Sequence, residues 1–150
     1  MKIFITGGTG FIGRHTVGLL IKRNYKLTLL VRKSSNTSFL KDQSVSLITG
    51  SITNKQSLLD GMKDCDTVIN LAGHYSFWEP DKKIYSQINI EGAKNVFECA
   101  LESGIKKIIH ISTAGVFGIP NDKPFNEEST PGPIQFSEYF RTKYEGDQIA

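Results

Sequence analysis

A glycine-rich stretch directly after the first apolar run constrains the fold more than any other part of the sequence. Residues 2–6, KIFIT, have the length and β-branched content of a short strand, and residues 6–13 read TGGTGFIG. The glycines fit two spacings, Gly8-Gly10-Gly13 and Gly7-Gly10-Gly13. Such a turn between a strand and a helix lets the backbone approach a pyrophosphate, to which the first N–H groups of the helix can donate. A purely structural turn is the alternative, but this position favours a dinucleotide site.

Strand-like and helix-like segments alternate along the chain. Further apolar runs of strand length lie at 27–31, 45–49, 66–72 and 106–112, and helical periodicity covers 11–24, 55–62 and 83–103. The strand runs are apolar almost throughout, which predicts a sheet covered on both faces. Strands joined by helix-sized crossovers predict an α/β fold of the Rossmann type, a doubly wound parallel sheet in one domain over 1–150.

The helical segments predict which side chains face the core. The first helix places Ile12, Val17, Leu20 and Ile21 at helical spacing. The long helix over 83–103 places Ile88, Val96, Ala100 and Leu101 on one side, and Gly104 ends it.

Composition excludes several classes of protein. The net charge is +3 and the basic residues are scattered, so we expect no nucleic-acid partner. No apolar run approaches membrane-spanning length and the N-terminus has no signal-peptide core, which predicts a cytoplasmic protein without a membrane partner. Cys65 and Cys99 lack a CxxC spacing or a neighbouring ligand set. We therefore expect two reduced, buried thiols and no metal site.

The residue after the second strand bears on the type of dinucleotide. An acidic residue there binds the adenosine ribose of NAD, whereas this sequence has Arg32, followed by Lys33 and Ser34. Arginine can bind a 2′-phosphate through charge-assisted hydrogen bonds. Arg32 therefore favours NADP over NAD, with an ordinary surface arginine as the alternative.

Tyr139 and Lys143 lie four residues apart near the end of the sequence, so that on a helix they share one face. A hydride can leave a carbinol carbon only if its hydroxyl proton is removed, and a tyrosine helped by a cation can accept that proton. The spacing alone is common on surface helices. The spacing indicates a catalytic pair only when the same chain also contains a dinucleotide-binding loop.

Five motifs in order give the chain a family resemblance: TGGTGFIG (6–13), NLAG (70–73), NIEGAKNV (89–96), HISTAGVFG (110–118) and YFRTK (139–143). Over all 150 residues the chain resembles the extended short-chain dehydrogenase/reductases, the NAD(P)-dependent epimerase/dehydratase group. The stretch AGHYSFWEP (72–80), with Arg32, further resembles the branch of dihydroflavonol-reductase-like and hopanoid-associated sugar epimerase proteins.

The resemblance implies roles for residues outside the arguments above. Asn89 would support the site from the long helix, and Thr113 would be the catalytic Ser/Thr, with Ser112 as the second candidate. Ser51 stands where the family has an aspartate that contacts adenine, which weakens that contact. The cofactor-binding residues implied are Gly7, Gly10, Phe11, Ile12, Gly13, Arg32, Ser51, Ile52, Leu71, Ala72 and Gly73.

In the resulting mechanism Tyr139 is the general base, or the acid in the reduction direction. Lys143 would favour tyrosinate and hold the nicotinamide ribose, and Thr113 would hydrogen-bond the substrate oxygen. The substrate would be a small molecule, either a sugar nucleotide or a dihydroflavonol-like compound.

Several other histidine, aromatic and glutamate residues are predicted to have no catalytic role. We expect His15 to be exposed, His110 to be a satisfied core residue and His74 to be a loop histidine that faces either the substrate or ordinary partners. Phe77 and Trp78 either line a substrate pocket or pack under a long loop over 115–136, and that loop would cover a ligand. Glu127 and Glu128 should be solvated.

Two functional classes stay open, an enzyme and a dinucleotide-binding module without turnover. Family members continue after the helix that carries Tyr139 with a substrate-binding lobe, so we expect the sequence to be a fragment truncated there, or else a naturally short binding protein. The family also implies a homodimer through the helices over 83–103 and 137–150.

Overall fold

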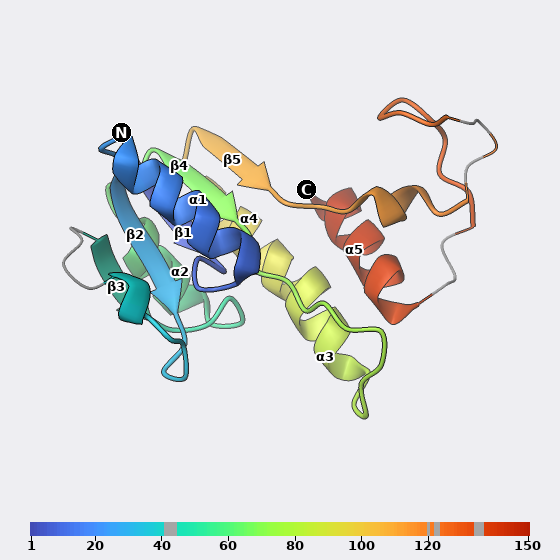
Figure 1. Ribbon diagram of the computed structural model, residues 1–150, viewed down its shortest axis with the longest axis horizontal. Helices are drawn as coiled ribbons and strands as arrows, with labels where there is room; N and C mark the ends of the chain where they lie inside the picture. The colour runs from blue at the N-terminus through green and yellow to red at the C-terminus, as the bar shows by residue number, and fades with distance from the viewer. Residues whose placement is uncertain (41–44, 120, 122–123, 134–136) are drawn as a thin grey trace.

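A five-stranded parallel sheet forms the centre of the computed structural model, which describes residues 1–40, 45–119, 121, 124–133 and 137–150 (Figure 1). The strand order is β3-β2-β1-β4-β5, which matches the first five strands of the 3-2-1-4-5-6 order of a Rossmann fold. The predicted fold class and all five strands are confirmed. The strands are β1 (Lys2–Thr6), β2 (Lys26–Val31), β3 (Val45–Thr49), β4 (Thr67–Asn70) and β5 (Lys107–His110).

Helices follow the strands in the predicted order. The longer ones are α1 (Phe11–Lys22), α2 (Lys55–Met62), α4 (Ala93–Glu102) and α5 (Glu138–Ile149). Shorter turns are η1 (Ser38–Leu40), α3 (Lys83–Tyr85) and η3 (Ala114–Phe117), and η2 (Ser86–Gly92) is a π-helical stretch. Among the described residues, no helix is long and apolar enough to cross a membrane.

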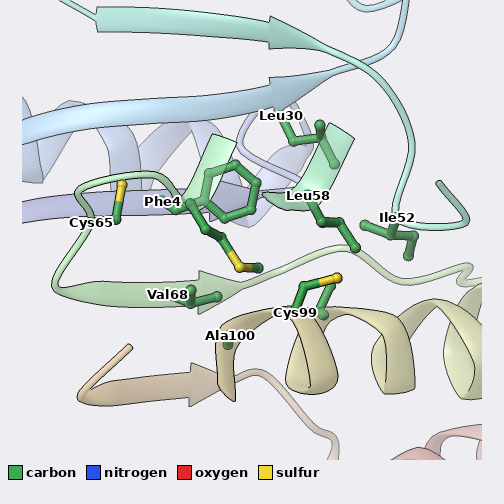
Figure 2. Packing of buried hydrophobic residues seen from close by; sticks show 10 residues of the cluster. Phe4, Leu30, Ile52, Leu58, Cys65, Val68, Cys99 and Ala100 are labelled. Atoms are coloured by element: carbon green, nitrogen blue, oxygen red, sulfur yellow. The ribbon is translucent and has the colours of Figure 1, made fainter. Parts of the chain in front are cut away.

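Alternate side chains of the central strands build two separate cores. Ile3 and Ile5 of β1 pack with Val17 of α1 on one face of the sheet. Phe4 points to the other face, where it joins Leu58 of α2 and further residues from α4, as Figure 2 shows. Helices therefore cover both faces of β1, β2 and β4, as their apolar runs predict. Cys65 and Cys99 are free thiols within the second core.

The two edge strands are less covered than predicted. β3 and β5 contain only partly buried and exposed residues, with Leu47 44% and Ile109 38% exposed. The expectation of a sheet covered on both faces is wrong for these strands. The described helices pack over the centre of the sheet, and an apolar run does not distinguish a central strand from an edge strand.

The long helix predicted over 83–103 is continuous, but it is not α-helical throughout. The π-helical turn η2 lies between α3 and α4, and Gly104 follows the helix with a φ of +66°. Leu101, which we expected on the buried side, is 75% exposed, and Ile12 of α1 is 55% exposed. Ile12 lies in the first turn of its helix, beyond the edge of the core.

Helix α5 lies beyond the end of the sheet toward which β5 points, and it contacts η2 and η3 (Figure 1). Its fully buried residues are Thr142, Lys143 and Gly146, none of them a large apolar side chain. A side chain at Gly146 would overlap the backbone oxygen of Asn89, so α5 crosses η2 in very close contact.

Candidate active site

The glycine loop is packed between the end of β4 and the start of α1. Gly7 has a φ of +68°, and a Cβ there would lie 2.6 Å from the backbone nitrogen of Ala72. A Cβ on Gly13 would overlap the carbonyl oxygen of Gly7, whereas one on Gly8 would meet side-chain atoms of Leu29 at 3.0 Å and of Val17 at 3.4 Å. Close backbone contacts therefore require glycine at Gly7 and Gly13, both members of the Gly7-Gly10-Gly13 spacing, while a Cβ on Gly10 would lie 3.3 Å from the Gly7 carbonyl oxygen.

Helix α1 begins at this loop with its N-terminus free of a side-chain cap. Gly10 is the N-cap residue and makes no side-chain hydrogen bond to the first turn. The N–H groups of that turn and the positive end of the helix dipole are suited to an anion. Phe11 is 85% exposed, so its side chain turns to solvent and only its backbone faces the loop.

A cavity of about 300 Å³ opens beside the glycine loop, within the size range of ligand pockets. It brings together all the predicted cofactor-binding residues except Phe11, Ile12 and Gly13, which belong to the first turn of α1. Residues that were not predicted to bind the cofactor also line it: Thr9, Leu30, Ser35, Gly50, His74, Ile84 and Ile88.

Arg32 lies on the rim of this cavity at the end of β2. Its side chain is exposed, and its backbone N–H donates to Ser35 Oγ at 3.0 Å, which folds the turn so that both residues line the cavity. Ser51 lies nearby, and its Oγ pairs with Thr53 Oγ1 at 2.9 Å. An exposed guanidinium beside a hydroxyl fits a phosphate group.

The predicted catalytic tyrosine is half-buried in an aromatic and hydroxyl environment. Burial raises the pKa of Tyr139, and a hydrogen bond with Thr113 opposes that rise. The ring of Tyr75 meets the ring of Tyr139 edge-on at 4.9 Å between centroids. The structure therefore places Thr113 beside Tyr139, while Ser112 donates to Asp147 Oδ2 instead.

Lys143 is 5% exposed, and its ammonium group contacts residues at the end of β5. Its Nζ donates to the carbonyl oxygen of Ile111 at 2.7 Å and lies 3.5 Å from His110 Nε2. Burial lowers the pKa of Lys143, and the charge of Asp147 partly restores it. The expected lowering of the Tyr139 pKa by Lys143 is absent from this arrangement, because the ammonium is held at the Ile111 carbonyl.

Asn89 of the π-helical turn links the loop after β4 to α5. Its Oδ1 accepts from the backbone N–H of His74 at 2.8 Å, and its Nδ2 donates to the His74 carbonyl at 3.1 Å. The same Nδ2 donates to Thr142 Oγ1 at 3.0 Å. A single amide therefore holds two segments of the site in place.

The remaining predicted residues take simpler places. His74 pairs with Glu79 at 2.8 Å, His15 is exposed, and His110 is hydrogen-bonded within the site. Phe77 and Trp78 are exposed and border a second, open cavity next to Arg141. Glu127 and Glu128 are exposed. The loop predicted to cover a ligand lies partly outside the described residues, and its described part does not line the first cavity.

The structure joins four further polar residues to the site: Thr6, Asn70 and Asp147, which had no predicted role, and His110, which was predicted to be a satisfied core residue. For Thr6, Asn70 and His110 the available signal was a polar side chain within an otherwise apolar strand run, and Asp147 on α5 had no such signal. Among the described residues, no group of three or more His, Cys, Asp and Glu side chains could hold a metal ion.

Comparison with known proteins finds one family across nearly the whole chain. Residues 3–150 match the model of the NAD dependent epimerase/dehydratase family. The chain is 31% identical over 149 residues to the "Putative dihydroflavonol 4-reductase" of Synechocystis sp., covering 98% of this chain and 43% of that protein. It is 31% identical over 144 residues to a UDP-glucose 4-epimerase of Neisseria meningitidis serogroup C, covering 87% of this chain and 42% of that protein.

Solved structures agree with these relatives. The Bordetella bronchiseptica enzyme WbmH, in complex with NAD+, superposes with a TM-score of 0.86 at 25% identity, over 99% of this chain and 51% of that one. The chain thus spans about half the length, or less, of the proteins that it matches.

Proposed function

The chain belongs to the NAD-dependent epimerase/dehydratase family, and on that premise we propose that it carries the cofactor and acid–base residues of an NADP-dependent oxidoreductase or epimerase. The reaction would be hydride transfer at a carbinol or carbonyl carbon. The observation that carries the proposal is Tyr139, hydrogen-bonded to Thr113 and one helical turn from the buried Lys143, in a fold that also holds the glycine-loop cavity.

Different residues of the protein would bind the cofactor, transfer the proton and hydrogen-bond the substrate. NADP, when bound, supplies or accepts the hydride. The backbone of the glycine loop and the uncapped start of α1 would bind its pyrophosphate. Tyr139 would give or take the hydroxyl proton, and Thr113 would hydrogen-bond the reacting oxygen. Lys143 would have to leave the Ile111 carbonyl to reach ribose hydroxyls.

The preference for NADP rests on Arg32 and Ser35 at the rim of the cavity. We expect Arg32→Glu to weaken NADPH binding by about tenfold or more while NADH binding changes little, because a carboxylate repels the 2′-phosphate. Isothermal titration with both cofactors measures this. Lys26→Glu, the same charge reversal at the exposed start of β2, is the control. Equal loss for NADPH and NADH would contradict the preference.

Exposed aromatic side chains favour a dihydroflavonol-like substrate over a sugar nucleotide. Tyr75 is 66% exposed, contacts Tyr139 and stacks edge-on with Phe77 at 5.4 Å. Planar rings bind well against such a patch. The relative named for dihydroflavonol reduction is consistent with this choice. Faster NADPH oxidation with a dihydroflavonol than epimerisation of UDP-glucose would support it, and the reverse order would refute it.

Catalysis itself is tested at the tyrosine. We expect Tyr139→Phe to lower turnover by about 10²–10⁴-fold with NADPH affinity unchanged, because the proton donor is lost. Tyr144→Phe, on the same helix, should leave turnover near the original value. Unchanged turnover in Tyr139→Phe would refute the assignment.

A second candidate function is a dinucleotide-binding module without turnover. The hydrogen bond from Lys143 to Ile111 favours it, since the ammonium does not support tyrosinate in this arrangement. Tight NADPH binding with no carbonyl reduced would support this alternative.

We also propose that the protein is cytoplasmic and forms a homodimer through the helices over 83–103 and 137–150. Arg141 on α5 pairs with Glu138 at 2.7 Å and offers a charged outer face to such a partner. Analytical ultracentrifugation of the protein and of Arg141→Glu tests the dimer.

A further inference from the structure

Three neighbouring strands end in polar residues that lie side by side. Thr6, Asn70 and His110 are the last residues of β1, β4 and β5, and the register pairs Thr6 with Asn70 and Asn70 with His110. Thr6 and Asn70 are fully buried, and the His110 side chain is 11% exposed. Burying such groups is costly unless they bond with each other.

These residues form a hydrogen-bond chain with one direction. The backbone N–H of Ala72 can only donate, and it donates to Thr6 Oγ1 at 3.3 Å. The Thr6 hydroxyl then donates to Asn70 Oδ1 at 2.5 Å. This leaves the Asn70 amide nitrogen to donate to His110 Nδ1, 3.0 Å away. His110 Nδ1 must therefore accept, so the proton of the neutral ring sits on Nε2.

The proton on Nε2 faces the catalytic helix. Nε2 lies 3.4 Å from Asp147 Oδ1 and 3.5 Å from Lys143 Nζ. An ammonium cannot accept a hydrogen bond, so the acceptor is the carboxylate. This 3.4 Å contact is long for a hydrogen bond, and Oδ1 of Asp147 is buried without any other partner among the described residues, while Ser112 donates to Oδ2.

Asp147 and Lys143 are the charged groups that face His110. Phe97 of α4 packs on the imidazole with ring centroids 5.3 Å apart, and Asn70 of β4 closes the remaining side. Lys143 is almost without solvent, so the nearby carboxylate is its available counter-charge. The orientation of that carboxylate decides how well the lysine keeps its proton.

We propose that His110 is a positioning residue that holds Asp147 as the counter-charge of Lys143. The hydrogen-bond chain that begins at the Ala72 N–H fixes His110 as the Nε2–H tautomer for this role. The inference rests on the proposed function, because Ala72 lines the cavity assigned to the cofactor and Lys143 is assigned to the reaction. Lys143 and Asp147 thereby gain a fixed geometry relative to the cofactor cavity.

The tautomer is measured directly by ¹⁵N NMR of the imidazole rings at about pH 8.5, where histidine is neutral. The protein has three histidines, and His110→Gln identifies the signal of His110. We expect Nε2–H for His110, with the exposed His15 as an internal reference. An Nδ1–H tautomer would overturn the proposal.

A variant that reverses the direction of the hydrogen-bond chain provides the decisive test. Asn70→Asp replaces the donor with an acceptor, so the His110 proton should move to Nδ1 or the ring should become doubly protonated, while His15 and His74 stay unchanged. Thr6→Val is the second variant, should Asn70→Asp fail to fold. It removes the group that orients Asn70, and we expect a mixture of His110 tautomers. An unchanged tautomer in a folded variant would refute the directional chain.

The effect of Asp147 and His110 on the titration of Lys143 is measured separately. In Asp147→Asn and in His110→Phe, ¹³C NMR of the lysine side chains should show Lys143 titrating at lower pH, with the larger shift in Asp147→Asn. Unchanged titration in both would refute the positioning role. These measurements need no cofactor, so a protein that bound no NADPH would refute the proposed function and leave them standing.

Discussion

The proposed cofactor side and the proposed catalytic side of the molecule are held together by different forces. On the cofactor side, β1, β2 and β4 with α1 and α2 bury apolar side chains on both faces of the sheet. On the catalytic side, η3 has no buried residue, and α5 docks through Thr142, Lys143 and Gly146. Apolar packing builds the scaffold, whereas hydrogen bonds and one close backbone contact place the reacting groups.

This difference predicts different costs of mutation. A large apolar side chain in a core contributes about 3–5 kcal/mol when truncated, while one hydrogen bond contributes about 1 kcal/mol. The catalytic helix should therefore loosen before the scaffold unfolds. The variants below test that order, beginning with the largest expected effect.

Phe4→Ala should lower the free energy of unfolding by about 3–5 kcal/mol, because the ring is fully buried between the sheet and α2. Urea denaturation measures the change. Phe125→Ala is the control on the catalytic side, where the ring is 42% exposed, and should cost less than about 1 kcal/mol. Similar losses for the two variants would contradict the comparison.

Gly146→Ala should displace α5 from η2 and cost about 1–3 kcal/mol, since the new Cβ overlaps the Asn89 carbonyl oxygen. Hydrogen exchange should quicken in α5 and stay unchanged in α1. The matched control is Gly18→Ala, where a new Cβ would lie within 4 Å of no other described part of the chain beyond its own helix turn, and alanine should stabilise α1 by about 0.5–1 kcal/mol. Equal protection of α5 in both variants would show that the contact is not limiting.

Thr142→Val should cost about 1–2 kcal/mol, because the buried Asn89 amide loses an acceptor. Thr16→Val on α1 makes a fair control, since its hydroxyl bonds only the Ile12 carbonyl one turn earlier, and should change stability by about 0.5 kcal/mol or less. Thermal unfolding compares them. A larger loss in Thr16→Val would reverse the ranking.

Asp147→Asn should have the smallest effect at neutral pH, about 1 kcal/mol. Burial raises the pKa of Asp147, but hydrogen bonds from His110 and Ser112 and the charge of Lys143 outweigh it, so the folded pKa is lowered. A lowered folded pKa means that the carboxylate stabilises the fold above about pH 4 and loses this contribution as pH falls through the folded value. The stability gap between the two proteins, followed by urea unfolding, should close in acid. A gap that widens in acid would contradict the direction of the shift.

Sequence patterns predicted the cofactor side better than the catalytic side for a physical reason. Apolar periodicity reports burial, so β1, β2 and α2 were found within a residue or two of their bounds. The exposure of β5 and Leu101 depends on which neighbours cover them, and periodicity does not carry that information. Strand order likewise depends on contacts between distant segments, whereas the parallel direction of the strands was predicted from the rules for helical crossovers between parallel strands.

The candidate site divides in the same way. The glycine loop and Arg32 were predicted from local sequence and Ser51 from the family resemblance, and residues of all three line one cavity. The partners of Lys143 come from β5 and from one helical turn ahead, so Ile111, His110 and Asp147 emerge only when α5 is docked. The aromatic contact of Tyr75 with Tyr139 spans 4.9 Å in space and 64 positions in the chain (139 − 75).

The π-helical turn sets a constraint on chain length as well as on composition. A turn closed from residue i to i+5 holds one residue more than an α-helical turn. Shortening Ser86–Gly92 by one residue could restore a regular helix, with Tyr85 and Val96 still facing the core. The regular helix would lack the wider turn that places Asn89 within hydrogen-bond distance of both the His74 backbone and Thr142. A one-residue gap here in a sequence alignment would thus mark a protein that keeps the scaffold and places its catalytic helix by other means.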